Sequence, residues 1–320
     1  MLTRRHIRIK VFQTVYAYIF SHKTEVHIGE KELVFNLDKT HELYLTYLTI
    51  FKEIRDFALQ KIEDAKNKNF PTEDELNPNM KFVENKVFGV LEENLELNNF
   101  IKKRKIRWET EADFNIIKQI WQGVKASDEY REYMNSGMDS LHEDKQFLIW
   151  IFKNHIALNE LLYDILEDKS IYWNDDLETI LSSISSTIDG IGADTDSHYK
   201  LRPLYKGEED LAFAKKLFRR TLANEEECSK LIHTQAENWD LDRFAKSDLI
   251  LMQMAITEAL DFPSIPIKVT LNEYIEISKF YSTPKSKQFI NGLLDKVFNE
   301  LKQSGRINKA GRGLINKSIK

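Results

Sequence analysis

The sequence predicts an all-α protein built from helical bundles. Apolar residues recur at three- and four-residue steps through most of the chain, which is the pattern of the buried face of an amphipathic helix. No alternating apolar–polar run reaches a convincing strand length. Breaks fall where proline, asparagine and glycine gather, at Phe70–Pro78 and at Gly190–Ser197. Helical periodicity with such breaks is typical of several helices in series.

The composition is that of a globular protein. A chain of 320 residues can bury one large core or two ordinary ones, and 42% hydrophobic with 30% charged residues fits a soluble domain. The single cysteine, Cys228, excludes an intrachain disulfide and suits a reducing compartment. No apolar run long enough for a signal peptide or a membrane span follows the basic start. We therefore expect a cytoplasmic protein with no membrane partner.

Positive charge is concentrated at the two ends of the chain. The net charge is −5, yet residues 1–10 hold four cations and no acid, and residues 302–320 hold six cations and no acid. Without these ten, 36 basic residues remain against 51 acidic ones. Basic ends on an acidic body indicate a local site for a polyanion. The alternative is that both ends are solvated termini without a ligand.

The first helix is expected to begin near Arg4. Its apolar residues cover so broad an arc that the helix should lie centrally in a bundle. Arg4 and Arg8 fall within the same arc, so we expect the core to end before the first turns and the guanidinium groups to project at a rim. There they could bind phosphates through paired hydrogen bonds. The alternative is that these arginines pair with acidic residues of the body.

Residues 23–204 are expected to form further helices, at about 41–66, 79–101, 109–135, 144–168 and 175–190. Six identities recur within this region and the following one at a constant offset of 66 residues. They pair Asp144, Phe147, Phe152, Ala157, Glu160 and Trp173 with Asp210, Phe213, Phe218, Ala223, Glu226 and Trp239. Both a degenerate duplication and chance agreement between amphipathic helix pairs explain them.

A basic run, Lys102–Arg107, precedes Trp108. Cations beside an aromatic ring can bind single-stranded RNA through charge and stacking. More often such a run is a solvated helix end, where cations favour the C-terminal dipole. Both interpretations stay open.

The C-terminal part carries three further helices. An apolar face over Trp239–Leu260 is followed by two prolines at Asp261–Pro266, which stop that helix. Thr270 and Glu273 have the spacing of a capping box, and Thr283 with Pro284 indicates the start of the last helix. Gly292 costs this last helix about 1 kcal/mol relative to alanine. We therefore expect a close approach to its backbone, most simply by another helix.

The order of these segments resembles the bacterial transcription antitermination factor NusB family. The resemblance rests on four segments: the arginine-rich start with Val11–Tyr16, the Trp239 helix, Leu271–Lys279, and the segment FINGLLDK from Phe289. No one of them is diagnostic, but four in the right order at both ends are fairly specific. The resemblance covers the first 22 residues and about 205–300. It implies a NusB-like bundle formed by residues 1–22 and 205–303, an inserted helical domain at 23–204, and a basic tail at 304–320.

The resemblance implies an antitermination factor that binds boxA-type single-stranded leader RNA of ribosomal RNA operons. Its partners would be NusE, a small-subunit ribosomal protein, and RNA polymerase with the other Nus factors. The mechanism would be binding only, with no cofactor. The implied RNA-binding residues comprise cations, aromatic rings and one amide: Arg4, Arg5, Arg8, Lys10, Lys285, Lys287, Tyr16, Phe213, Phe289 and Asn291. For Phe289, a place in the core is the alternative, because Ile290 and Leu293 flank it.

Catalytic chemistry finds no support in the sequence. The eight histidines include no His-x-x-x-His or His-Glu-x-x-His pair, and neither a P-loop nor a strand-borne G-x-G-x-x-G is present. Acidic neighbours should raise the pKa of the Cys228 thiol. We expect no metal and no enzyme. The alternatives are a helical scaffold that binds only protein, and an accessory factor in ribosomal RNA modification or maturation; binding to a short single-stranded RNA separates the scaffold from the others.

Overall fold

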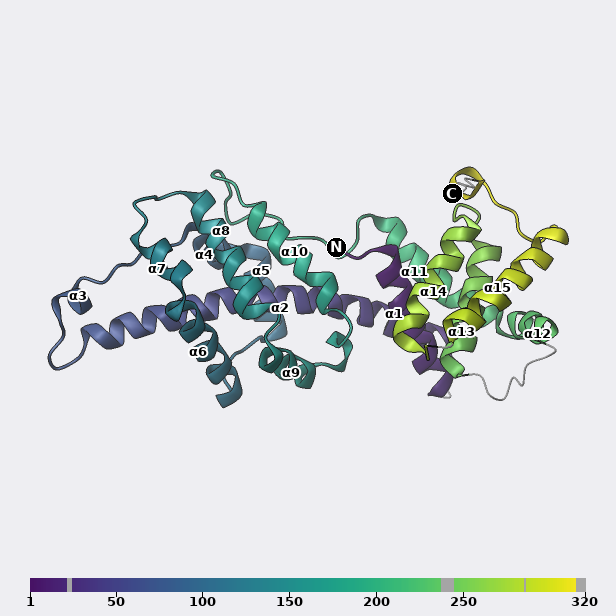
Figure 1. The fold of residues 1–320 in the computed structure, drawn as a ribbon, viewed down its shortest axis with the longest axis horizontal. Coiled ribbons are helices and arrows are strands. Elements are labelled where there is room, and N and C mark those ends of the chain that lie inside the picture. The colour runs from purple at the N-terminus through teal and green to yellow at the C-terminus, as the bar shows by residue number, and fades with distance from the viewer. Residues whose placement is uncertain (22–24, 237–244, 285, 315–320) are drawn as a thin grey trace. The chain divides into compact units, whose positions relative to one another are not determined.

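The structure is a computed structural model that describes residues 1–21, 25–236, 245–284 and 286–314. Over these ranges every regular element is a helix, which confirms the all-α fold (Figure 1). The chain divides into two compact units: residues 38–204 with Met1, here called the inserted unit, and residues 2–37 with 205–320, here called the bundle unit. No helix in the described ranges is long and apolar enough to cross a membrane.

The boundary between the units lies inside helix α2, Val26–Lys66, between Leu37 and Asp38, and not at residue 22. The first turns of α2 belong to the bundle unit because they pack on α11, Glu208–Ala223. The carboxylate of Glu30 pairs with two cations of α11, Lys215 at 3.4 Å and Arg219. Gly29 permits the close contact, since a Cβ there would lie 2.5 Å from the ring of Phe218. Sequence periodicity cannot show that a helix passes from one core to another.

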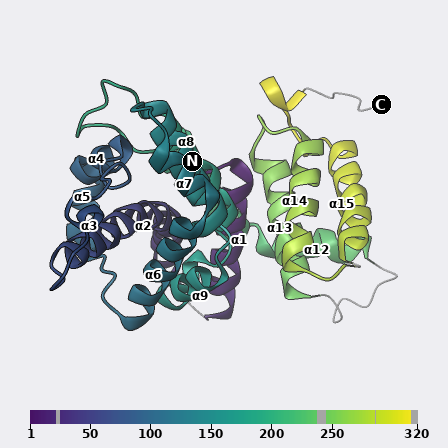
Figure 2. The same cartoon turned by 60° about the vertical axis from the view of Figure 1, so that its left-hand side comes forward.

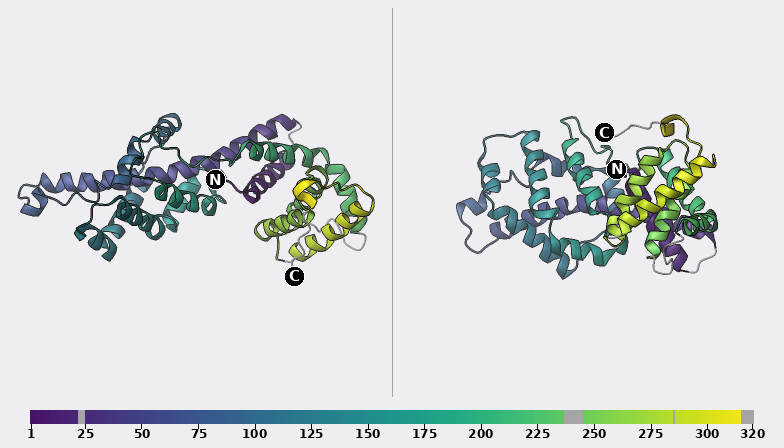
Figure 3. Two further views of the ribbon diagram at one scale, coloured as in Figure 1. Left: turned by 90° about the horizontal axis from the view of Figure 1, so that it is seen from above. Right: turned by 45° about the vertical axis from the view of Figure 1, so that its right-hand side comes forward.

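In its described residues, the bundle unit contains the start of α2 and six further α-helices: α1, Arg4–Phe20; α11; α12, Glu225–Gln235; α13, Lys246–Asp261; α14, Ile267–Tyr281; and α15, Ser286–Gln303. Helices α13, α14 and α15 pack side by side, as Figures 1, 2 and 3 show. The central helix is α13. Its residues 250–259 are all buried, and it contacts α1, α11, α12, α14 and α15. Helix α1 was expected to be central. It packs against α11, α13 and α14 but leaves Tyr16 and Phe20 on an exposed face.

Two local expectations for the bundle unit are wrong. Helix α14 begins at Ile267 behind Pro266, so Thr270 does not cap it; its hydroxyl instead donates to Glu258 Oε1 at 2.8 Å. A Cβ at Gly292 would meet no atom within 4 Å among the described residues, so no described helix approaches closely there. Trp239 and the start of its expected helix lie outside the described residues.

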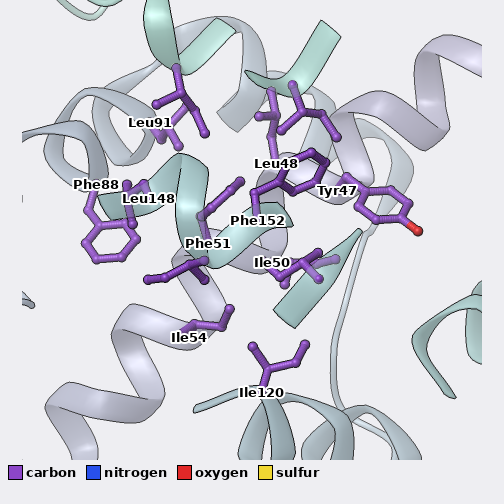
Figure 4. Packing of buried hydrophobic residues seen from close by; sticks show 14 of the residues in the cluster. Tyr47, Leu48, Ile50, Phe51, Ile54, Phe88, Leu91, Ile120, Leu148 and Phe152 are labelled. Atoms are coloured by element: carbon purple, nitrogen blue, oxygen red, sulfur yellow. The ribbon is translucent and has the colours of Figure 1, made fainter. Parts of the chain in front are cut away.

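The inserted unit contains the rest of α2 and eight α-helices: α3, Glu73–Leu76; α4, Lys86–Glu93; α5, Leu95–Arg104; α6, Glu111–Ala126; α7, Asp128–Asn135; α8, Leu141–Ile151; α9, Glu160–Lys169; and α10, Leu177–Asp189. Its core gathers apolar side chains from most of these helices, including Phe51, Phe88, Ile120 and Phe152 (Figure 4). No residue of the bundle unit belongs to this cluster.

Three of the long helices expected in this unit are divided. Asn94, Ser127 and Asn159 each turn the chain and accept a hydrogen bond from the first turn of the next helix, which starts α5, α7 and α9. A π-helical turn, Phe152–Ile156, also ends α8. Short polar side chains inside an apolar pattern therefore marked new helix starts. The 66-residue repeat stays a prediction: both copies place an aspartate and two phenylalanines in buried positions of a helix, and Trp239 is not described.

Candidate nucleic-acid interface

An open groove of about 1370 Å³ lies in the bundle unit at the N-terminal end of α1. It is formed by the first turns of α1, the start of α11, the connection between α13 and α14, and the first turns of α14. Its polar lining includes Arg4, Arg5, Arg8, Lys216 and Glu273, and its apolar lining Phe213, Phe262, Ile265, Pro266 and Val269. The groove therefore combines cations with an apolar floor, as a nucleic-acid site requires.

The start of α1 presents two arginines to this groove. Thr3 is in extended backbone conformation and its hydroxyl accepts from His6 N at 3.3 Å, which fixes where the helix begins. No acid lies in the first turn, so Arg4 and Arg5 stand at its positive end without a neighbour in sequence to neutralise them. The charge partners must come from other helices.

Arg4 and Arg5 are each held by a carboxylate and remain partly exposed. Arg4 Nε lies 2.9 Å from Asp210 Oδ1, with its guanidinium 4.4 Å from the centre of the Phe213 ring. Arg5 donates twice to Glu273, from Nε at 2.8 Å and from a terminal nitrogen at 2.9 Å. These hydrogen bonds raise the pKa of Arg5. The side chains of Arg4 and Arg5 are 40% and 44% exposed, so a phosphate can reach both.

Arg8 does not lie at a rim. Its side chain is 3% exposed and donates to the fully buried carboxylate of Glu258 at 2.7 and 2.9 Å. Glu258 also accepts from the Thr270 hydroxyl at 2.8 Å and the Tyr274 hydroxyl at 3.4 Å. Burial alone would lower the pKa of Arg8, but the Glu258 carboxylate outweighs it and the pKa is raised. The Arg8–Glu258 pair joins α1 to α13, and the Thr270 and Tyr274 hydroxyls connect it to α14. Each of the three arginines therefore pairs with an acidic residue of the bundle unit.

Lys10 and Phe213 are buried as well. Lys10 is 1% exposed. Phe213 is 5% exposed; Arg4 covers its ring and Phe262 contacts it in a T-shaped arrangement with centroids 5.2 Å apart. Phe213 lies at the floor of the groove but presents little surface to a base, and Lys10 is not part of the groove lining. Neither burial nor the facing helix is visible in the sequence of one helix.

The α15 residues differ among themselves. Lys287 is exposed, Phe289 and Asn291 are half-buried, and Lys285 lies outside the described residues. The pKa of Glu276 on α14 is lowered, chiefly by the hydrogen bond from Lys279 and further by the charges of Arg5 and Lys287. One carboxylate thus senses both cations, so Lys287 and Arg5 belong to one surface of the bundle unit. Phe289 lies at the edge of the core, so its half-buried position fits both a contact with RNA and a place in the core.

Tyr16 lies on α1 beyond the groove, with an aromatic neighbour that sequence reasoning missed. Its side chain is 40% exposed and its ring centre lies 4.6 Å from that of Phe20, which is 47% exposed. Phe20 follows Tyr16 by four residues, so helical spacing was a signal for this pair. Glu273 and Lys216 were also missed, and no local pattern indicates them, because only the packing of α14 and α11 on α1 brings them to the groove.

The basic run of the inserted unit is partly engaged. Arg104 and Arg107 pair with Glu42 and Glu109, at 3.4 and 3.3 Å. Trp108 donates from its indole nitrogen to Thr49 at 2.9 Å, and the Lys169 ammonium lies 4.2 Å from the centre of its ring. The ring is therefore already occupied by a cation and is no open stacking surface. This supports the interpretation as a helix end.

Among the described residues, no three histidine, cysteine, aspartate or glutamate side chains gather as metal ligands. Burial raises the pKa of the Cys228 thiol to about 11, so the thiol stays protonated at neutral pH. Fold and groove together define a helical-bundle protein with an arginine-bearing groove.

Comparison with known proteins assigns the chain to a protein family. The model of the NusB family matches residues 193–299. The transcription antitermination protein NusB of Salinibacter ruber is 46% identical over 113 residues, which are 35% of this chain and 71% of that protein. The chain belongs to the NusB family. The proteins of the same name from Chloroherpeton thalassium and Natranaerobius thermophilus are 44% and 41% identical over 32% and 27% of this chain, and 49% and 61% of their own lengths. No solved structure matches.

Proposed function

We propose that this protein is a transcription antitermination factor that binds boxA-type single-stranded leader RNA together with NusE. With RNA polymerase and the other Nus factors, the complex would resist termination in ribosomal RNA operons. Family membership supports the role, since the similar proteins are named transcription antitermination proteins. The observation that carries the RNA contact is the pair of partly exposed arginines, Arg4 and Arg5, in the groove of the bundle unit.

Arg4 and Arg5 provide the phosphate contacts in this proposal. A guanidinium binds a carboxylate and a phosphate oxygen pair in the same way, so RNA would replace Asp210 and Glu273. Both guanidinium groups are partly exposed although Asp210 is buried, so RNA would reach them in competition with these two carboxylates. Arg8 and Lys10 are buried and do not touch the RNA in this proposal.

Sequence reading requires base contacts, which phosphate contacts cannot supply. Unstacked bases of single-stranded RNA lie on aromatic rings in many complexes. Tyr16 with Phe20 offers such a surface, and the half-buried Phe289 with Lys287 offers a second one on α15. The factor would tether leader RNA to the polymerase without making or breaking a bond.

The test is a titration of the full-length protein with a labelled boxA-type RNA over a range of salt concentrations. Replacing Arg4 and Arg5 by glutamine should weaken binding and reduce the log–log salt slope by about 0.7 for each lost contact. The matched control replaces Arg131 and Lys153, two exposed cations of the inserted unit, and changes the net charge equally. Unchanged affinity and slope for the Arg4 and Arg5 variant would refute the RNA contact. No binding by the unaltered protein would favour the protein scaffold instead.

A further inference from the structure

A second groove lies in the inserted unit, outside the residues that match the family model. Its volume is about 640 Å³, within the range of about 300–1,000 Å³ usual for ligand sites. One wall is the last part of α2 and the other is one face of α6. The segment around Phe82 and the ring of Tyr130 complete it.

Both walls of this groove carry lysines. Lys61 lies on α2 and Lys68 just beyond its end, while Lys118 and Lys125 lie on α6. The two on α6 are separated by seven residues, so they stand about 10 Å apart along the same face of the helix. All four side chains are exposed. Cations therefore flank the groove on both sides.

The acids nearby neutralise one wall only. Lys61 Nζ lies 2.9 Å from Asp64, and Lys68 pairs with Glu75. Asp74, the third acid of the lining, lies in the first turn of α3, where the helix dipole favours it. Lys118 and Lys125 have no ion-pair partner in the described part of the chain. The α6 wall thus keeps its charge available for an anion.

The floor between the walls is aromatic. Phe82 and Trp121, which are 2% and 7% exposed, have ring centres 4.9 Å apart, and the half-buried ring of Tyr130 packs against Trp121 in a T-shaped contact at 5.6 Å. Phe57 adds a fourth ring from α2 and contacts Phe114, which is 52% exposed, at 5.6 Å. Interlocked rings of this kind keep their positions when a ligand binds, so the floor is preorganised.

We propose that this groove is a second binding site for single-stranded RNA. Lysines along its walls would hold the phosphates, and the half-buried rings of Phe57 and Tyr130, supported by the buried Phe82 and Trp121, would contact the bases. The ligand class follows from the combination, because an aromatic floor without cations suits an apolar peptide and cations without rings suit any anion. Stacking tolerates every base, so the contact adds affinity with little sequence preference. This site is independent of the groove in the bundle unit.

The test uses the full-length protein and a 12-residue oligouridylate that carries 5-bromouridine. Irradiation should cross-link it to peptides that contain Phe57 or Tyr130, and the yield against RNA concentration gives an affinity for this groove alone. Replacing Lys118 and Lys125 by glutamine should raise the half-saturation concentration about tenfold at 0.1 M salt. It should also reduce the salt slope by about 1.4.

The matched control replaces Lys153 and Lys200, which are exposed in the same unit and do not line the groove. It should leave the cross-links unchanged. Cross-links confined to the bundle unit, or equal losses in both variants, would overturn the proposal. So would cross-links unaffected by the Lys118 and Lys125 change while binding of an acidic helical peptide is lost. Circular dichroism of all variants should match that of the unaltered protein, because every changed side chain is exposed. If this second site is refuted, the test of RNA binding by Arg4 and Arg5 in the bundle unit is unaffected.

Discussion

Replacing Arg8 by methionine tests whether this arginine is structural or binds RNA. Arg8 is 3% exposed and its partner Glu258 is fully buried, so the change strands a carboxylate in the core. Removal of one partner from a buried ion pair costs about 3–5 kcal/mol. The Thr270 and Tyr274 hydroxyls still donate to Glu258, at 2.8 and 3.4 Å, and this remaining solvation favours the lower end of that range.

Urea unfolding followed by circular dichroism measures this cost. The two units can unfold separately, so the loss should appear in the transition of the bundle unit, with the other transition unchanged. Arg5→Met is the matched control. Its pair with Glu273 is partly exposed, and the change should cost about 1 kcal/mol or less. Adding Glu258→Leu to Arg8→Met should restore part of the stability, because the unpaired charge is removed.

RNA affinity supplies the second readout. Without urea, and at a temperature where the bundle unit remains folded, Arg8→Met should bind RNA as tightly as the unaltered protein does. Arg5→Met should bind RNA less tightly under the same conditions. A loss of unfolding free energy below about 1 kcal/mol for Arg8→Met, together with weakened RNA binding, would refute the assignment. It would mean that Arg8 turns outward to the phosphates.

Three further predictions follow from the same geometry. Glu273→Gln should strengthen RNA binding several-fold in an anisotropy titration, because it frees Arg5 from its carboxylate; weaker binding would show that Glu273 does not compete with RNA. Phe289→Ala should lose about 1–3 kcal/mol of RNA binding with little change in melting temperature, whereas a loss of about 3–5 kcal/mol in stability would place the ring in the core. Removing residues 38–204 and joining the ends through a short flexible linker should leave a folded helical protein by circular dichroism. The His41 ring lies 3.1 Å from the Arg202 carbonyl, so the ends of the removed unit are close together; an unfolded product would mean that the two units share a core.

Much of the fold could be predicted because a helix shows itself in the spacing of apolar residues along its own sequence. The apolar stripe over Ile290, Leu293 and Leu294 is buried as its spacing indicates. Helix ends were less visible. Thr270 has the spacing of a cap but lies inside α14, where its hydroxyl binds Glu258 instead, and Asn94 ends one helix and starts another without a sequence break as strong as proline. A polar side chain can bond to several backbone or side-chain partners, and only the folded chain selects one.

The surroundings of the arginines could not be predicted from the sequence. Arg4 and Arg5 are partly exposed at the groove, whereas Arg8, which was expected with Arg4 at a rim, and Lys10 are buried. Gly292 was expected to have a close neighbour, most simply another helix, yet no described atom would lie within 4 Å of a Cβ there. In each case the periodicity states which residues share a face, and it does not state how far the neighbouring helices extend along that face.

The sequence by itself determined that this chain is all-α, that it belongs among NusB-like proteins, and that cations gather at its start. Those properties depend on residue types and on spacings within one helix, which the chain carries locally. The tertiary structure alone decided which arginines remain accessible and where the inserted unit begins. Arg8 meets Glu258 across 250 residues of sequence, and α2 passes from one core to another without a break in its periodicity. Contacts of that range arise only when distant helices pack, because burial depends on what covers a face.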